Sequence, residues 1–128
     1  MAKSILIVEN SLEYQQLISE IVVAMGHEAI AVDRATTAWE TLQQRDIALV
    51  LLDIKMPSVH GHHFMRFIRK HSKQLSTIVI SGFLTPAVIE SLRESQVSTI
   101  IVKPFKVRRL TEEIARALEA IPEATPEP

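Results

Sequence analysis

Polar residues able to carry out phosphate and metal chemistry stand at the ends of short apolar runs in this sequence. They are Glu9 and Asn10, Asp53, Ser81 and Lys103. A carboxylate fixed at the end of a strand, such as Asp53, can act as a nucleophile. A lysine ammonium and a serine hydroxyl can stabilise the oxygens of the phosphoryl group that this carboxylate attacks. Together with Glu9, Asp53 can also hold Mg²⁺, which prefers oxygen ligands.

These residues can act together only if the fold brings them to one place. Short runs rich in β-branched residues predict strands, and apolar residues three and four positions apart predict helices. Strands are expected at 3–8, 28–32, 47–52, 77–81 and 98–102. Helices are expected at about 11–25, 36–44, 62–71, 85–95 and 106–120. The alternation predicts an α/β fold with a parallel sheet between helices, in which ligands bind at the carboxyl ends of the strands.

The composition is that of an ordinary globular domain and excludes several kinds of site. The chain has 128 residues and a net charge of −1, which argues against broad nucleic-acid binding. It has no cysteine, hence no disulfide or thiolate metal site, and its three glycines are too far apart for a Gly-rich phosphate loop. No apolar run approaches the length of a membrane span. We expect a cytoplasmic domain at 1–121, with a disordered tail or truncated linker at 122–128.

Local patterns predict how two of the helices begin. Asn10 followed by Glu13 is typical of an N-cap, and Thr37 followed by Glu40 is typical of a capping box. A second interpretation makes Asn10 a weak metal ligand, and the sequence leaves both open. Tyr14 is expected to pack within its helix or lie on the helix surface rather than to bind a ligand.

Four segments, correctly spaced and in order, resemble the response-regulator receiver domains of two-component signalling, the CheY-like family. They are 5–9 (Ile-Leu-Ile-Val-Glu), 51–57 with Gly61 (Leu-Leu-Asp-Ile-Lys-Met-Pro), 80–82 (Ile-Ser-Gly) and 102–105 (Val-Lys-Pro-Phe). The resemblance extends from residue 3 to about residue 120. It implies a doubly wound, flavodoxin-like sheet of five parallel strands in the order 2-1-3-4-5, with five helices.

The resemblance also implies roles for the residues at the strand ends. Asp53 matches the aspartate that accepts a phosphoryl group from a histidine kinase or a phosphotransfer protein. Lys103 matches the family's active-site lysine, and Ser81 matches the hydroxyl residue that responds to phosphorylation. The peptide bond before the proline that matches Pro104 is usually cis in the family, which would direct the lysine inward.

Two positions depart from the family pattern. The resemblance implies that Glu9, Asn10, Asp53 and the backbone carbonyl of Lys55 lie around Mg²⁺. The family usually has a second acid at the position of Asn10, so we expect weaker Mg²⁺ binding and slower phosphorylation. Ile100 stands where the family has a switch aromatic, so we expect any response to phosphorylation to travel through backbone and loop shifts.

Three functions compete. The first is a phosphoacceptor receiver that changes partner binding when Asp53 is phosphorylated. The second is a pseudo-receiver, in which the same fold acts as a phosphate-independent interaction module, and the changes at Asn10 and Ile100 favour it. The third is an enzyme such as an aspartyl-phosphate phosphatase, which ranks far behind because 53–55 lacks the second acid of those enzymes. We therefore expect a signalling domain that is not an enzyme.

The expected partners follow from the resemblance. They are a histidine kinase or phosphotransfer protein, and a downstream protein that binds the face of the fourth helix, fifth strand and fifth helix. A homodimer through that face is a further expectation, whereas no contact with a membrane, and no direct contact with nucleic acid by this domain, is expected. Because only a short tail follows the last helix, the chain is expected to be either a single-domain regulator or a fragment of a longer protein.

Overall fold

The computed structural model describes residues 2–53, 75–82, 86, 89–90 and 99–119. The strands are β1 (Ser4–Val8), β2 (Glu28–Val32), β3 (Leu49–Leu52), β4 (Ser76–Ser81) and β5 (Thr99–Val102). The helices are α1 (Leu12–Ala24), α2 (Ala35–Gln44) and α5 (Val107–Glu119). The helix expected at 62–71 lies outside the described residues, as does most of the one expected at 85–95.

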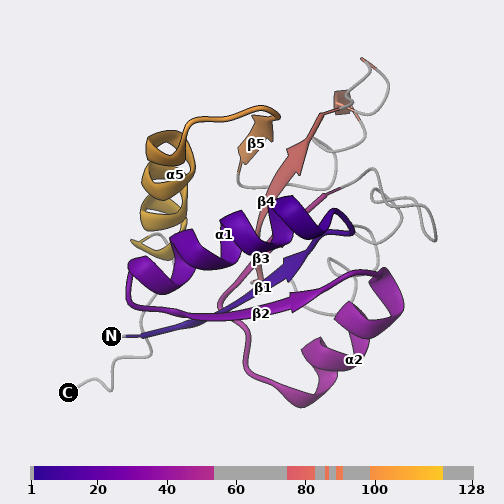
Figure 1. The fold of residues 1–128 in the computed structure, drawn as a ribbon. Helices are drawn as coiled ribbons and strands as arrows, with labels where there is room; N and C mark the ends of the chain where they lie inside the picture. Colours follow the sequence, from indigo (N-terminus) through magenta and orange to yellow (C-terminus); the bar gives the residue numbers. More distant parts are fainter. Residues whose placement is uncertain (1, 54–74, 83–85, 87–88, 91–98, 120–128) are drawn as a thin grey trace.

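All five expected strands are present and form one sheet. Every pair of neighbouring strands is parallel, and the order is β2-β1-β3-β4-β5 (Figure 1). This confirms the predicted doubly wound order. β3 is buried along its whole length, as expected of a central parallel strand that is covered on both faces.

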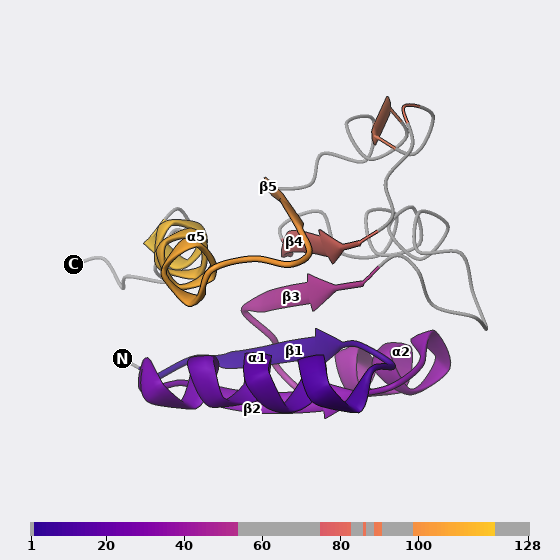
Figure 2. The same cartoon turned by 45° about the horizontal axis from the view of Figure 1, so that its top comes forward.

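The sheet has an apolar cluster on each face because alternate residues of a strand point to opposite sides. α1 and α5 cover one face, and α2 covers the other (Figure 2). The strand residues under α1 and α5 include Ile5, Ile7, Leu49, Leu51, Ile78, Ile80 and Ile101. Those in the cluster with α2 include Leu6, Val8, Val50, Leu52 and Val79. Burial of both faces fixes the register of each strand, and hence where each strand ends.

Both predicted N-caps are wrong, although each helix begins within one residue of its expected start. The N-cap of α1 is Ser11, whose hydroxyl accepts a hydrogen bond from Tyr14 N at 3.4 Å, and Asn10 is exposed. The N-cap of α2 is Arg34, which makes no side-chain capping bond, and Thr37 lies inside the helix. α2 begins instead at the buried Ala35, so packing against the sheet sets its start rather than a capping box.

None of the helices in the described part of the chain is long and apolar enough to cross a membrane.

Candidate functional site

Sheet hydrogen bonding continues one residue beyond three of the strands. Glu9 N donates to Val32 O at 3.0 Å, and Asp53 N donates to Val8 O at 2.9 Å. In the same way, Lys103 N donates to the carbonyl of Ser81 at 2.9 Å. These bonds fix the backbone of Glu9, Asp53 and Lys103 at the carboxyl edge of the sheet. Each of the three lies two residues beyond a strand residue of the α1 and α5 face, namely Ile7, Leu51 and Ile101.

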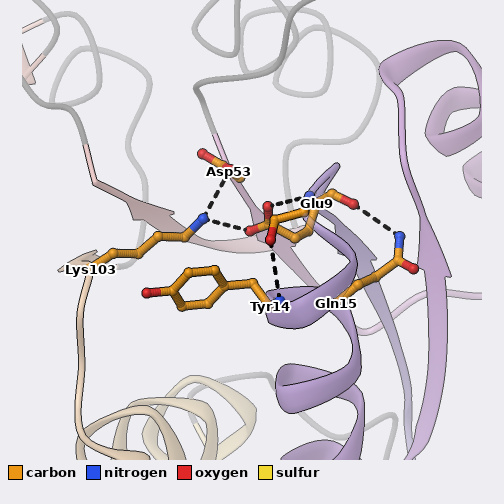
Figure 3. A network of polar contacts seen from close by, with 6 residues as sticks. Glu9, Tyr14, Gln15, Asp53 and Lys103 are labelled. Atoms are coloured by element: carbon orange, nitrogen blue, oxygen red, sulfur yellow. Dashed lines mark hydrogen bonds and ion pairs between the residues drawn. The ribbon is translucent and has the colours of Figure 1, made fainter.

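The three side chains meet in a buried ion cluster. Lys103 Nζ lies 2.9 Å from Glu9 Oε1 and donates a hydrogen bond to Asp53 Oδ2 at 3.2 Å (Figure 3). The side chains of Glu9, Asp53 and Lys103 are 2%, 5% and 13% exposed. Two carboxylates and one ammonium leave a formal charge of −1 (−2 + 1) in a site almost closed to water. The predicted convergence of these strand ends is therefore present.

The first turn of α1 holds Glu9 in place. Ser11 N donates to Glu9 Oε2 at 3.0 Å, and Gln15 Nε2 donates to the backbone carbonyl of Glu9 at 2.9 Å (Figure 3). Among the described residues no donor makes a well-aligned hydrogen bond to Glu9 Oε1, although that oxygen is buried. The oxygen therefore relies on its ion pair with Lys103 and keeps capacity for another positive group.

Burial and charge shift two pKa values of the cluster in the same direction. Burial raises the pKa of Glu9 above its ordinary value, although Lys103 and the Ser11 N–H favour the ionised form. Burial lowers the pKa of Lys103, but Glu9 and Asp53 outweigh this effect and the net shift is upward. Lys103 is therefore firmly protonated at neutral pH. Ionisation of the buried Glu9, by contrast, lowers the stability of the folded chain.

Replacing Glu9 with glutamine is expected to raise the free energy of unfolding near pH 7, because a neutral side chain avoids the cost of ionising a buried carboxyl group while Lys103 keeps its pair with Asp53. The folded-state pKa of Glu9 lies above its ordinary value of 4.5, so the folded chain binds this proton more tightly than the unfolded chain. Ionisation of Glu9 therefore costs stability as pH rises. The gain in the free energy of unfolding of Glu9→Gln over the parent chain should be absent below pH 4.5. It should grow as pH rises through the folded-state pKa of Glu9. Urea unfolding of both proteins across this range measures it.

The exposed Glu28 supplies a control of opposite sign. Arg45 and then Ser4 lower the pKa of Glu28, so ionised Glu28 contributes stability that is lost as pH falls through its folded-state pKa. Glu28→Gln should therefore lose stability at neutral pH and converge with the parent chain in acid. A gain for Glu9→Gln that does not change with pH would contradict the assigned cause.

Ser81 lies at the same edge as the ion cluster. It is the last residue of β4 and fully buried, and it pairs in register with Val102, the residue before Lys103. Gly82 follows it, and a Cβ there would lie 3.6 Å from Lys103 Cβ, in ordinary van der Waals contact. Ser81 is thus beside the lysine in the sheet, while the chemical role of its hydroxyl stays a prediction.

Tyr14 is a neighbour of the site that sequence reasoning missed. Its ring centroid lies 4.0 Å from Lys103 Nζ (Figure 3). Its ring also packs against Phe105, with centroids 5.9 Å apart. The predicted packing role is present, and a contact with the ammonium of the site accompanies it. No local sequence pattern predicts this contact, because it joins the start of α1 to the loop after β5.

The remaining predicted positions divide between the described and the undescribed residues. Lys55 lies outside the described residues. Asn10 is exposed beside Glu9, so its capping role is wrong and its role as a metal ligand stays a prediction. Ile100 is half-buried and packs against the cluster on the α2 face. The peptide bond between Lys103 and Pro104 is cis, as expected.

The oxygen atoms at this edge fit a hard divalent cation such as Mg²⁺. Glu9 and Asp53 are neighbouring buried carboxylates, and Glu9 Oε1 lacks an aligned donor. Across the residues that the structure describes, no three His, Asp or Glu side chains gather as a metal cluster. A cation would therefore need neutral oxygens, such as the amide of Asn10 or water, beside two carboxylates, which suits Mg²⁺ because it keeps several waters.

Comparison with known proteins decides the family. The family model of the response regulator receiver domain matches residues 5–115. The chain belongs to the response regulator receiver domain family. This receiver domain is 31% identical over 124 residues to the response regulator protein FleR of Pseudomonas aeruginosa, covering 95% of the chain but 26% of FleR. It is 27% identical to the response regulator receiver protein CpdR of Brucella abortus, covering 92% of the chain and 98% of CpdR.

Solved structures agree on the fold. A CheY-like receiver domain protein from Methanospirillum hungatei superimposes with a TM-score of 0.89 at 23% identity, over 93% of this chain and 95% of that one. Receiver domains are signalling domains that interact with histidine kinases and downstream effectors, and they typically bind Mg²⁺ at their acidic pocket. The receiver domain spans about a quarter of FleR and nearly all of CpdR. The domain boundary at residue 121 stays a prediction.

Proposed function

We propose that this receiver domain accepts a phosphoryl group on Asp53 and changes its partner binding in response. The observation that carries the proposal is the direct pairing of Lys103 Nζ with a buried Asp53 carboxylate at the carboxyl edge of the sheet. A phosphoacceptor must be held still and kept from bulk water, and it must have a cation nearby for the phosphoryl oxygens. Asp53 meets the first two needs through the sheet, and Lys103 meets the third.

The chemistry follows from these positions. A carboxylate oxygen of Asp53 forms a bond to phosphorus, while the bond from phosphorus to the donor's leaving group breaks and its electron pair departs with that group. Asp53 reacts as the carboxylate, so no base is required to deprotonate it. The Lys103 ammonium stabilises charge on the phosphoryl oxygens, and the Ser81 hydroxyl is proposed to donate to one of them once it is in place.

Glu9, Asp53 and Asn10 are the described residues proposed to hold Mg²⁺, with the carbonyl of Lys55 as a further ligand expected from the family. When bound, Mg²⁺ supplies positive charge that neutralises the phosphoryl oxygens. Glu9 and Asp53 contribute two negative charges, and Asn10 contributes an oxygen without charge. The ammonium of Lys103 already pairs with both carboxylates, so affinity for the cation is proposed to be modest.

Replacing Asn10 with aspartate is expected to tighten Mg²⁺ binding by roughly ten-fold, because a third carboxylate adds charge at the rim of the site. Titration calorimetry with MgCl₂ measures the change. Gln16→Asp is the matched control, since it adds the same charge at an exposed position further along α1 and should change the affinity by less than about two-fold. Equal affinities for Asn10→Asp and the parent would remove Asn10 from the ligand set.

The proposed donor of the phosphoryl group is a histidine kinase or a phosphotransfer protein. The proposed downstream partner binds the face expected for the fourth helix, β5 and α5, and the described part of that face exposes Val102, Val107 and Arg108. A homodimer through this face, the absence of direct nucleic-acid contacts and the cytoplasmic location stay predictions. The proposal describes a switch rather than an enzyme that turns over a substrate.

The test is intact-mass spectrometry after incubation with acetyl phosphate and MgCl₂. The expected result is a gain of one phosphoryl group, which borohydride trapping and peptide mapping assign to Asp53. Phosphoramidate and a panel of histidine kinases are tried in parallel, because some receivers take phosphate from one donor only. Failure with every donor, on both the parent and Asn10→Asp, would overturn the proposal and leave a phosphate-independent interaction module.

A further inference from the structure

The ammonium of Lys103 is enclosed by three groups, and one of them is aromatic. Glu9 Oε1 and Asp53 Oδ2 lie 2.9 and 3.2 Å from Nζ, and the ring centroid of Tyr14 lies 4.0 Å away. A cation over a ring face is attracted by the ring quadrupole, and this attraction is stronger where water is excluded. With its side chain 13% exposed, Lys103 meets that condition.

The ring is itself fixed from two sides. Tyr14 lies in the first turn of α1, where its backbone N–H bonds to the Ser11 hydroxyl at 3.4 Å. Phe105 packs on the ring with an interplanar angle of 43°. Phe105 is two residues beyond Lys103, so the segment that carries the lysine also braces the ring that faces it. Figure 3 shows Tyr14 alongside the lysine stem, with the two carboxylates beyond the ammonium.

We propose that Tyr14 is a positioning residue of the phosphoryl-transfer site, whose ring face holds the Lys103 ammonium between Glu9 and Asp53. The part of this inference that concerns the reaction rests on the proposed function. A lysine side chain is long and flexible, and ordering it costs conformational entropy. The ring closes one side of the ammonium to water without offering a competing hydrogen-bond acceptor. Lys103 is thereby kept against Asp53 before a phosphoryl group arrives.

The experiment compares Tyr14→Leu with Tyr14→Phe. Leucine keeps apolar volume but removes the ring face, whereas phenylalanine keeps the face and removes only the hydroxyl. The first readout is the NMR order parameter of the Lys103 Cε methylene, which reports how tightly the side chain is held. The second is the initial rate of phosphoryl adduct formation from acetyl phosphate. Tyr14→Met is a second ring-free variant in case the leucine variant fails to fold.

The expected result is a clear fall in Lys103 order in Tyr14→Leu, with a rate roughly 3- to 10-fold below the parent. Tyr14→Phe should retain the order and stay within about two-fold of the parent rate. Unchanged Lys103 order without the ring would overturn the inference, and so would lower order with an unchanged rate. A parent chain that forms no adduct would overturn the proposed function, and the order parameter alone would then decide whether Tyr14 positions Lys103.

Discussion

Replacing Asp53 with alanine is expected to abolish the phosphoryl adduct on this receiver domain. Asp53 is the carboxylate that the sheet fixes beside Lys103, and it is 5% exposed. Without it the nearest acid, Glu9, has an oxygen already bound to Ser11 N and lies against the start of α1. The measurement is intact mass with acetyl phosphate and MgCl₂, and the expected loss exceeds about 100-fold because the nucleophile itself is removed.

Asp33 offers a stringent control for this experiment. It directly follows β2 at the same edge of the same sheet, but it is exposed and pairs with the exposed Arg34. Asp33→Ala should therefore leave adduct formation unchanged. An adduct that persists in Asp53→Ala, or disappears in Asp33→Ala, would show that the acceptor is misassigned. Asp53→Ala should also remain folded, because Lys103 keeps Glu9 as its partner.

Replacing Lys103 with methionine is expected to lower the free energy of unfolding by about 3 kcal/mol near pH 7. Among the described residues Lys103 is the one cation within ion-pair distance of Glu9 or Asp53, and its loss leaves two buried carboxylates side by side. The same variant should accept phosphate on the order of 100-fold more slowly, since no ammonium remains for the phosphoryl oxygens. Lys106→Met is the matched control, because Lys106 is exposed in the same loop.

The pH dependence separates this cause from a simple packing defect. The pKa of Glu9 is already raised, and without Lys103 it should rise further, so the destabilisation should shrink as pH falls and Glu9 becomes neutral. Lys103 contributes stability that is fully present below its ordinary pKa of 10.5 and lost as pH rises through its higher folded-state pKa. Urea unfolding measured in the acid range and in the alkaline range tests both expectations. Equal stabilities for the Lys103 and Lys106 variants would refute the argument.

The ion cluster was predictable because each of its members marks the end of a strand. Asp53 ends an apolar run that can only be a buried strand, and Lys103 follows the last such run. Parallel topology then brings these ends to one edge, so local patterns and one topological rule were sufficient. The strand order was obtained from the family resemblance and is confirmed by the sheet.

Details that depend on tertiary contacts were missed. Asn10 and Ser11 are both good N-caps, and the structure has Ser11 in that role, with its N–H donated to the carboxylate of Glu9. The N-cap of α2 was missed for a similar reason, since α2 begins at the buried Ala35 and has no side-chain capping bond. The contact of Tyr14 with Lys103 joins distant parts of the chain, and spacing cannot reveal it.

The origin of the three charged groups on the first, third and fifth strands has a consequence for folding. No short segment contains the site, so the longest loops must close before Lys103 reaches Glu9. A chain in which β5 has detached loses the ammonium while keeping both acids, and a nascent chain lacks it until the last strand has been made. Full competence to take up phosphate therefore requires the fifth strand to be in place and is lost whenever that edge unfolds locally, so the reaction reports on the integrity of the whole sheet.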